Sequence, residues 1–372
     1  MSEERMPKVP TEEGREPGSQ WDAGEPALTP EGTPQGPPVR ARRGNEIHAF
    51  PETAVGEGDV RGAEDGGAPA RGTSLWRDAW RRLLKNKLAV FGMVVVGLII
   101  VAVLVGPYVI KATTGFEYFS VPTTDVERQS FPPFTAPDGT FSWTHPMGTD
   151  IFGRDMLTRV LQGGRISLMV GIIATLVSLL IGIAWGATAG YLGGKIDDVM
   201  MRIVDVLYAI PYMMIVIVLL AFFGGQTPLK QIFLLFAALG AVSWLTMARI
   251  VRGQIISLKN QEFVLAARAT GVSTPKIIFR HLVPNALGPV IVYATLTIPS
   301  VMLQEAFLSF LGLGVQAPYA SWGSLAQEGI QNIAIFPWQL IFPGVTMALT
   351  LFSLNFLGDG LRDALDPQMR KF

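Results

Sequence analysis

The chain has 372 residues, of which 49% are hydrophobic and 16% charged, and its mean hydropathy is +0.36. It is therefore more apolar than an average soluble protein. The formal net charge at pH 7 is zero, so the total charge predicts no nucleic-acid partner. The chain has no cysteine, which excludes disulfides, thiol nucleophiles and cysteine-based metal sites. Its three histidines lie far apart in the sequence, and we expect no metal and no cofactor.

Residues 1–72 are rich in Pro, Gly, Glu and Arg and contain almost no aliphatic clusters. Such a composition cannot bury enough apolar surface to fold, so we expect a disordered cytoplasmic tail. The tail is too acidic, and too poor in apolar stretches, for a signal peptide. The next segment, 73–110, begins with Trp76, Trp80, Leu83 and Leu84 at helical spacing, with basic residues between them. This pattern predicts an amphipathic helix on the inner membrane surface, followed by the first membrane span.

Six apolar segments are each close to the roughly 20 residues that a helix needs to cross a bilayer. The predicted spans are 88–110, 166–189, 203–223, 231–248, 287–311 and 338–357. The sequence thus predicts an all-α polytopic membrane protein with six transmembrane helices. Pro211 in the third span and Pro299 in the fifth are expected to kink their helices. In the second span, Gly182, Gly186 and Gly190 predict a smooth stripe for close helix packing.

Basic residues are distributed unevenly between the loops. Six lie between Arg71 and Lys87, six between Arg249 and Arg280, and none between the fifth and sixth spans. The positive-inside rule therefore places both termini and the 250–286 loop in the cytoplasm. The remaining predicted parts are an external loop (111–165), a membrane core (166–358) and a short cytoplasmic tail (359–372).

The segment from Gln261 to Asn285 reads QEFVLAARATGVSTPKIIFRHLVPN. Good helix formers fill its first ten residues, and Gly271 supplies a left-handed stop. Thr274 followed by Pro275 predicts a helix N-cap with proline at the first helical position. A second short helix is expected to end before Pro284.

Three acidic or imidazole side chains before the second span, His145, Asp150 and Asp155, could form a metal or acid–base site. We favour a structural interpretation, in which Thr149 or Asp150 caps a short helix. That helix is expected to run from 151 to 162 and to end at the Gly163–Gly164 pair.

Glu305 is the one carboxylate well inside a predicted span, and Gln304 lies beside it. Ionisable groups in membranes are costly, so Glu305 is expected either to line a translocation path with Gln304 or to bind a partner group at a subunit contact. Asp205, at the inner end of the third span, is expected to pair with Arg202 or Arg249.

Several stretches together resemble one family. They are AARATG and RHLVPN in the 261–285 segment, HPMGTDIFGRDMLTRVLQGGRISLMVG (145–171), GGKIDDVMMRIVD (193–205) and LSFLGLGVQAPYASWG (308–323). In order and without large gaps, residues 73–370 resemble the second, C-type permease subunit of the dipeptide, oligopeptide and nickel ABC importers. Two departures are small. Leu265 stands where the wider family often has glutamate, and Met147 where the peptide group usually has leucine.

The resemblance implies a type I ABC importer permease fold in a bacterial or archaeal cell membrane. Its implied partners are a second permease in a heterodimer, two separate ATPases, an extracytoplasmic solute-binding protein and membrane lipid. The implied coupling residues are Glu262, Ala266, Ala267, Arg268, Gly271 and Pro284: Gly271 forms the corner, the alanines face the ATPase, and Arg268 and Glu262 flank them.

The leading hypothesis is a pore subunit for peptide uptake, not an enzyme, because no GxxxxGK[ST] nucleotide-binding motif occurs in the chain. The same importer type carrying nickel or another small solute is an alternative. A second alternative is an ion-coupled secondary transporter that uses Glu305 and Asp205 as ion sites. An intramembrane enzyme is a third, but HExxH and GxSxG motifs are absent.

Overall fold

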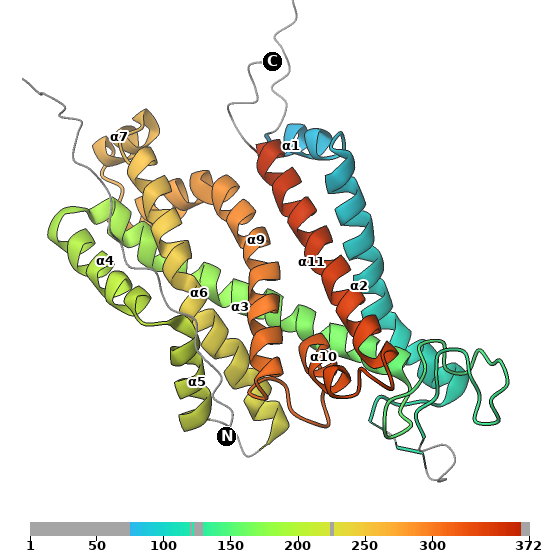
Figure 1. Ribbon diagram of the computed structural model, residues 1–372. Helices are drawn as coiled ribbons and strands as arrows, with labels where there is room; N and C mark the ends of the chain where they lie inside the picture. The colour runs from blue at the N-terminus through green and yellow to red at the C-terminus, as the bar shows by residue number, and fades with distance from the viewer. Residues whose placement is uncertain (1–74, 120, 123–128, 224–226, 366–372) are drawn as a thin grey trace, which may run out of the picture. The chain divides into compact units, whose positions relative to one another are not determined.

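A computed structural model of the protein describes residues 75–119, 121–122, 129–223 and 227–365. The predicted 1–72 tail lies outside these ranges, and so do the last seven residues of the predicted 359–372 tail. The described residues form helices joined by loops (Figure 1). In chain order the helices are α1 (Leu75–Leu83), α2 (Lys87–Thr114), α3 (Met156–Leu192), α4 (Gly194–Ala209), α5 (Tyr212–Phe223), α6 (Pro228–Leu258), α7 (Glu262–Ala269), α8 (Thr274–Lys276), the π-helix η1 (Ile277–Leu282), α9 (Val283–Phe310), α10 (Trp322–Gln331) and α11 (Trp338–Leu365).

The prediction of an all-helical membrane protein is confirmed. Within the described ranges, five helices are long and apolar enough to cross a membrane, or six if the bent pair α4 and α5 forms one span. Those two helices meet at an angle of 81°. The break falls at Pro211, which has no backbone N–H to continue the helix and holds the preceding Ile210 in an extended conformation (φ −81°, ψ 129°). The predicted kink at Pro211 is thus a complete interruption, whereas Pro299 lies inside the unbroken helix α9.

Helix α3 is longer at its start than the predicted second span. Asp155 is its N-cap and accepts a hydrogen bond from the Thr158 amide at 2.7 Å. The predicted caps at Thr149 or Asp150 are therefore wrong, and so is the predicted stop at Gly163–Gly164. These glycines permit close packing instead: a Cβ on Gly164 would lie 2.5 Å from the Trp322 ring. The helix continues because nothing in its backbone requires a left-handed residue there.

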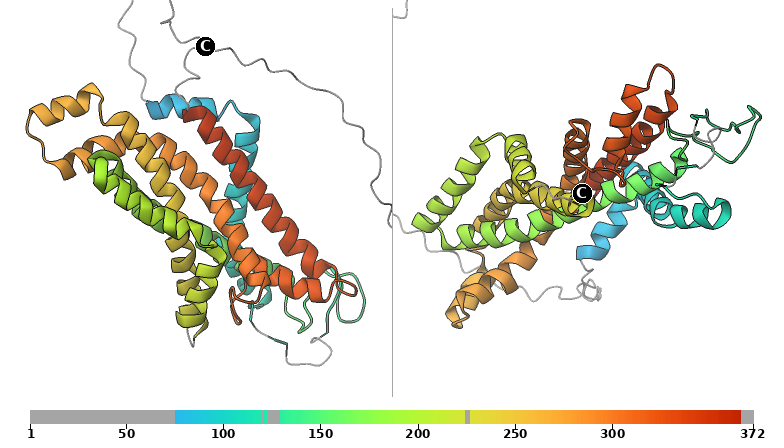
Figure 2. Two further views of the ribbon diagram at one scale, coloured as in Figure 1. Left: turned by 60° about the vertical axis from the view of Figure 1, so that its left-hand side comes forward. Right: turned by 90° about the horizontal axis from the view of Figure 1, so that it is seen from below.

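The predicted packing role of the glycine stripe in α3 is confirmed. A Cβ added at Gly186 would overlap the carbonyl oxygen of Ala248 in α6, and one at Gly190 would lie 2.8 Å from the carbonyl oxygen of Arg252. The stripe lets the α3 and α6 backbones approach each other directly. Figures 1 and 2 show the two helices crossing at the centre of the bundle.

Helix α1 packs on the ends of α2 and α11 (Figure 2). Its buried residues Ala79 and Leu83 join Ala89 and Ala364 in one small cluster. Trp80 points away from this cluster and is 54% exposed. The helix predicted here is confirmed. Some of its apolar residues pack against α2 and α11, and others face outward.

The second half of the 261–285 segment differs from the prediction. Ser273, rather than Thr274, is the N-cap of α8, and the helix does not end at Pro284. Instead η1 adds a wider turn, in which the Val283 amide bonds the carbonyl of Ile278 at the i→i−5 spacing. Pro284 then occupies the first turn of α9, where its missing N–H is tolerated because the wider turn has already changed the hydrogen-bond register.

Candidate functional site

We call residues 261–285, which contain the predicted coupling residues, the coupling segment. It lies at one end of the bundle, and the loop after α2 and helix α10 lie at the other (Figure 1). Helix α7 ends in a Schellman motif: the amides of Gly271 and Val272 donate to the carbonyls of Arg268 and Ala267 at 3.0 and 3.1 Å. Gly271 has φ +75°, so the predicted left-handed corner is confirmed.

The two alanines of the coupling segment are not equivalent. Ala266 is exposed, whereas Ala267 is 8% exposed and packs with Val264 in the same core cluster as η1. Glu262 and Arg268 are exposed as well. The Arg268 Nε donates to the Tyr191 hydroxyl at 3.2 Å, which ties the coupling segment to the end of α3. Outward contacts are therefore available to Glu262, Ala266 and Arg268 but not to the Ala267 side chain.

Three exposed apolar side chains on the coupling segment were missed by the sequence analysis. Phe263, Leu265 and Phe279 are 39%, 50% and 52% exposed. The signal was available in the i, i+3 spacing of Val264 and Ala267, which identifies the buried face of α7 and leaves Phe263 and Leu265 off it. Exposed apolar residues beside basic ones are typical of a protein-docking surface.

The base of the coupling segment is joined firmly to the bundle. Only residues 259–261 separate α6 from α7. Lys259 Nζ donates to the carbonyl of Gly190 at 3.1 Å, and Arg252 binds Asp197 through two hydrogen bonds of 2.6 and 2.7 Å. These contacts join the end of α6, which leads into α7, to the end of α3 and to the start of α4.

Within the membrane-spanning part, the two polar residues singled out in α9 have different surroundings. Glu305 is fully buried and accepts hydrogen bonds from Ser309 at 2.6 Å and from Ser167 of α3 at 3.4 Å. Gln304 instead lines a cavity of about 350 Å³ between α4, α5, α6 and α9. Gln304 and Glu305 therefore do not line one path together, as predicted. Gln304 lies in a cavity wall, whereas Glu305 lies in a buried cluster of serines.

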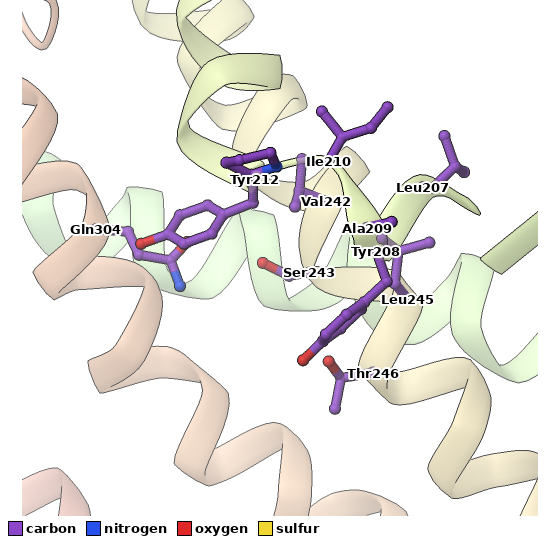
Figure 3. A pocket seen from close by; sticks show the side chains of 11 residues that line it. Leu207, Tyr208, Ala209, Ile210, Tyr212, Val242, Ser243, Leu245, Thr246 and Gln304 are labelled. Carbon is purple, nitrogen blue, oxygen red and sulfur yellow. The ribbon is translucent and has the colours of Figure 1, made fainter. Parts of the chain in front are cut away.

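We call this space the Gln304 cavity (Figure 3). Its other polar lining residues are two tyrosines, one on either side of the α4–α5 break, and a serine and a threonine of α6. The full lining consists of Leu207, Tyr208, Ala209, Ile210, Pro211, Tyr212, Val242, Ser243, Leu245, Thr246 and Gln304. Figure 3 shows the Tyr212 ring pointing from the start of α5 towards Gln304. The sequence analysis singled out Gln304 and Pro211 but missed the other lining residues, because the break that forms the cavity brings four helices together.

The predicted ion pair of Asp205 is confirmed, with Arg249 as its partner. Arg249 Nη2 lies 2.8 Å from Asp205 Oδ1, and the Arg249 guanidinium lies over the Tyr208 ring at 4.3 Å from its centre. Because Tyr208 lines the Gln304 cavity, the Asp205–Arg249 pair lies beside the cavity. The two opposite charges are paired with each other.

At the other end of the bundle, the acidic residues before α3 bind cations of the chain itself. The Asp150 carboxylate accepts hydrogen bonds from Arg154 at 2.6 Å and from Arg159 at 2.7 Å, and Arg159 also binds Glu328 of α10 at 2.8 Å. His145 Nδ1 lies 3.0 Å from Asp155 Oδ1. Among the described residues no group of three or more His, Cys, Asp or Glu is arranged to hold a metal ion. These contacts fix α3 against α10.

Comparison with known proteins gives two family matches. Residues 179–371 match the model described as binding-protein-dependent transport system inner membrane component, which is more than half of the chain. Residues 74–133 match the N-terminal TM domain of oligopeptide transport permease C. The chain belongs to the binding-protein-dependent transport permeases. Being a permease of an ABC importer, it is a pore subunit rather than the ATPase.

Curated relatives cover most of this permease. The oligopeptide transport system permease protein OppC of Escherichia coli K12 is 50% identical over 299 residues, or 80% of this chain and 93% of the relative. OppC of Haemophilus influenzae is 48% identical over 80% of this chain and 90% of the relative. The dipeptide permease DppC of Bacillus subtilis is 44% identical over 80% of this chain and 87% of the relative. Among solved structures, a chain of the inward-facing MetNI methionine ABC transporter has a TM-score of 0.47 at 18% identity, covering 57% of this permease and 98% of that chain.

The two matched ranges contain different features of the permease. The longer range contains the coupling segment and the whole lining of the Gln304 cavity, whereas the shorter one contains α1 and α2. The features with a candidate functional role thus lie in the part of the chain shared with the broader transport family.

Proposed function

We propose that this permease forms half of the transmembrane pore of an ABC importer for peptides. Its proposed partners are a second permease, two ATPase subunits and an extracytoplasmic binding protein that delivers the cargo. The observation that carries the cargo assignment is the identity of 44–50% with relatives named as oligopeptide and dipeptide permeases. Nickel and other small solutes remain the alternative cargoes within the same transporter type.

The coupling segment is the proposed contact for the ATPase. Its exposed side chains include the small Ala266 and the apolar Leu265. The charged side chains of Glu262 and Arg268 are exposed beside them. Because α7 is only eight residues long and is capped by a glycine corner, its exposed face is short and well defined. Such a face suits insertion into a groove on a partner protein.

The proposed orientation places the coupling segment in the cytoplasm. Arg268, Lys276 and Arg280 lie on the coupling segment, whereas the connection 312–337 at the other end of the bundle contains no Lys or Arg. This asymmetry supports cytoplasmic N- and C-termini under the positive-inside rule. The loop between α2 and α3 is then external, on the side where a binding protein would dock.

In the proposed mechanism, ATP-driven closure of the ATPases displaces α7. The displacement passes to α6 through residues 259–261, and to η1 and α9 through the shared core of Val264 and Ala267. Helices α6 and α9 both line the Gln304 cavity, so motion at the coupling segment changes access to the cavity. This is the rigid-element coupling that alternating access requires.

The alternative of an ion-coupled secondary transporter has less support. Its two candidate ion sites are already occupied by groups of the chain itself: Glu305 by the hydroxyls of Ser309 and Ser167, and Asp205 by Arg249. It also leaves the exposed apolar surface of the coupling segment without a role.

The test is a co-purification of the tagged permease from its native membrane in mild detergent, with partners identified by mass spectrometry. Two variants at one position are compared, Gly271→Pro and Gly271→Asn. Proline cannot adopt φ +75° and removes the amide that donates to Arg268, whereas asparagine tolerates the left-handed region.

We expect the native permease and Gly271→Asn to recover a second permease and ATPase subunits. Gly271→Pro should retain the second permease and lose the ATPases. Loss of neither partner in Gly271→Pro would contradict the coupling role, and recovery of the native permease alone would contradict the importer assembly.

A further inference from the structure

We propose that the Gln304 cavity is a contact site for the peptide main chain during transport, with the Gln304 amide as its central group. The inference rests on the proposed function and adds to it the site and the kind of recognition. The cavity is the place where the third span is broken, so that two helix ends, rather than continuous helices, form one wall. Interrupted helices at membrane depth are tolerated where they line a cavity.

The cavity lies along the apolar helices α6 and α9 and away from their ends. Gln304 lies six residues before the end of α9, about 9 Å from that end. Ser243 and Thr246 lie near the middle of α6, well away from both of its ends. Four helices therefore direct polar groups into one space inside the membrane-spanning part, where contact with hydrocarbon would be unfavourable.

These polar groups retain unused hydrogen-bonding capacity. Among the described residues the Gln304 amide reaches only the Ser300 hydroxyl, at a long 3.4 Å, although it carries two N–H donors and a carbonyl acceptor. Tyr208 and Tyr212 are 53% and 40% exposed. By contrast, the Ser243 hydroxyl donates to the Leu239 carbonyl of its own helix at 2.8 Å. Gln304 and the tyrosines are thus the groups that remain available to a ligand.

The chemistry of the lining matches a peptide main chain. A glutamine amide can donate to a peptide carbonyl and accept from a peptide N–H, so one side chain can pair with one peptide unit. Tyrosines add flat apolar surface for side chains of varied shape, with a hydroxyl at the edge. The volume of about 350 Å³ is at the small end of ligand cavities, so it holds a short part of a peptide.

The lining also explains tolerance of cargo sequence. All eleven lining residues are uncharged at neutral pH. The charges beside the cavity, Asp205 and Arg249, neutralise each other at 2.8 Å. The cavity therefore recognises the peptide unit that every peptide carries and does not select one charged side chain.

The test uses the absence of cysteine in this permease. Two single variants, Gln304→Cys and Leu303→Cys, are each assembled into the full importer in membrane vesicles. The vesicles are treated with a water-soluble thiol reagent. The subunits are then separated, and modification of this subunit is measured. Leu303 is the matched control because it is 57% exposed but does not line the cavity. We expect Gln304→Cys to react, and to be protected when the binding protein loaded with tri-alanine is added with ATP. Leu303→Cys should show no protection.

A second measurement compares transport of tri-alanine with that of its analogue N-methylated at both peptide bonds, which lacks the amide N–H donors. The binding protein is saturated with either peptide, so that its own selectivity cancels. We expect Gln304→Leu to lose about fivefold to tenfold of the preference for tri-alanine, the value of one hydrogen bond. Leu303→Ala should keep the preference.

The outcomes separate the inference from the proposed function. If the native importer moves tri-alanine but Gln304→Cys is unreactive or unprotected and Gln304→Leu keeps its preference, the peptide site is overturned. Loss of the second permease from Gln304→Leu on co-purification would overturn it too, since the cavity would then be a subunit contact. If the native importer hydrolyses ATP but moves no tri-alanine, the peptide function itself fails.

Discussion

The coupling segment and the Gln304 cavity are formed in contrasting ways. The coupling segment is specified locally: within a dozen residues it has a buried stripe at Val264 and Ala267, a left-handed glycine and a Schellman motif. The cavity has no local signature and exists because four helices meet around the break at Pro211. The end of the permease proposed to contact the ATPase is thus short, capped and well packed, whereas the part proposed to contact cargo is open and incompletely bonded.

This difference matches the two tasks. Force is transmitted well by an element with one backbone conformation, since a flexible element would absorb the displacement. A site for many peptides is better served by groups with spare hydrogen-bonding capacity. Helix α6, which packs along α3, connects the two regions, because it carries residues of the cavity and leads into α7.

The largest effect is expected from Gly186→Leu, which should disturb the coupling segment and the Gln304 cavity together. The new side chain would overlap the Ala248 carbonyl and force α3 and α6 apart, with a loss of about 3 kcal/mol or more in stability. Thermal unfolding of the purified permease in detergent measures this loss. Gly253→Leu is the matched control, because no atom lies within 4 Å of a Cβ at that exposed position of α6. Equal destabilisation by both variants would contradict the packing role of the stripe.

The next effect should fall on the coupling segment alone. Phe263→Ala and Leu265→Ala remove exposed apolar side chains, so each is expected to weaken ATPase binding about tenfold while leaving the melting temperature unchanged. Binding of the purified ATPase subunits to the immobilised permease measures the change. Phe233→Ala, at an apolar position in α6 that is also exposed (62%), should leave binding unaffected. An unchanged affinity in both coupling variants would move the ATPase contact elsewhere.

A third change should act on the cavity and spare the coupling segment. Pro211→Ala restores a backbone N–H and removes the steric constraint on Ile210, so α4 and α5 gain the possibility of joining in one helix. We expect peptide uptake to fall severalfold while the ATPase subunits still co-purify. Loss of the ATPases in this variant would show that the two regions are not separable.

The smallest effect is expected from Tyr212→Phe. This change keeps the ring against the cavity and removes only the hydroxyl, so uptake of tri-alanine should fall by about threefold, less than one full hydrogen bond. Tyr191→Phe is a control at the other region, since it removes the hydroxyl that accepts from Arg268. It should alter ATPase binding rather than peptide selectivity.

Local signals in the sequence predicted part of this molecule well. The apolar segments, the corner at Gly271 and the glycine stripe of α3 all follow from period, composition or spacing within short windows, whereas the choice of Arg249 over Arg202 as the partner of Asp205 required the structure. In each case the physical cause, such as bilayer length or a positive φ, acts within one or two helices.

Features that depend on packing between distant segments could not be predicted. Gly163 and Gly164 read locally as a helix stop, but residues more than 150 positions later make them a contact surface: Ser321 and Leu325 lie against Gly163, and the ring of Trp322 lies against Gly164. The π-turn before Pro284 has no propensity signal, so a helix end was expected there. The separation of Gln304 from Glu305 likewise depends on α4, α6 and the serines of α3 and α9, not on their adjacency in sequence.

The decisive measurement is uptake of labelled tri-alanine by vesicles that contain the complete importer, with ATP on the ATPase side and no ion gradient. We expect uptake that requires the loaded binding protein, stops with a non-hydrolysable ATP analogue and is lost in Gly271→Pro. Uptake that continues without ATP when an ion gradient is imposed, or transport of Ni²⁺ with no transport of tri-alanine, would contradict a peptide importer driven through the coupling segment.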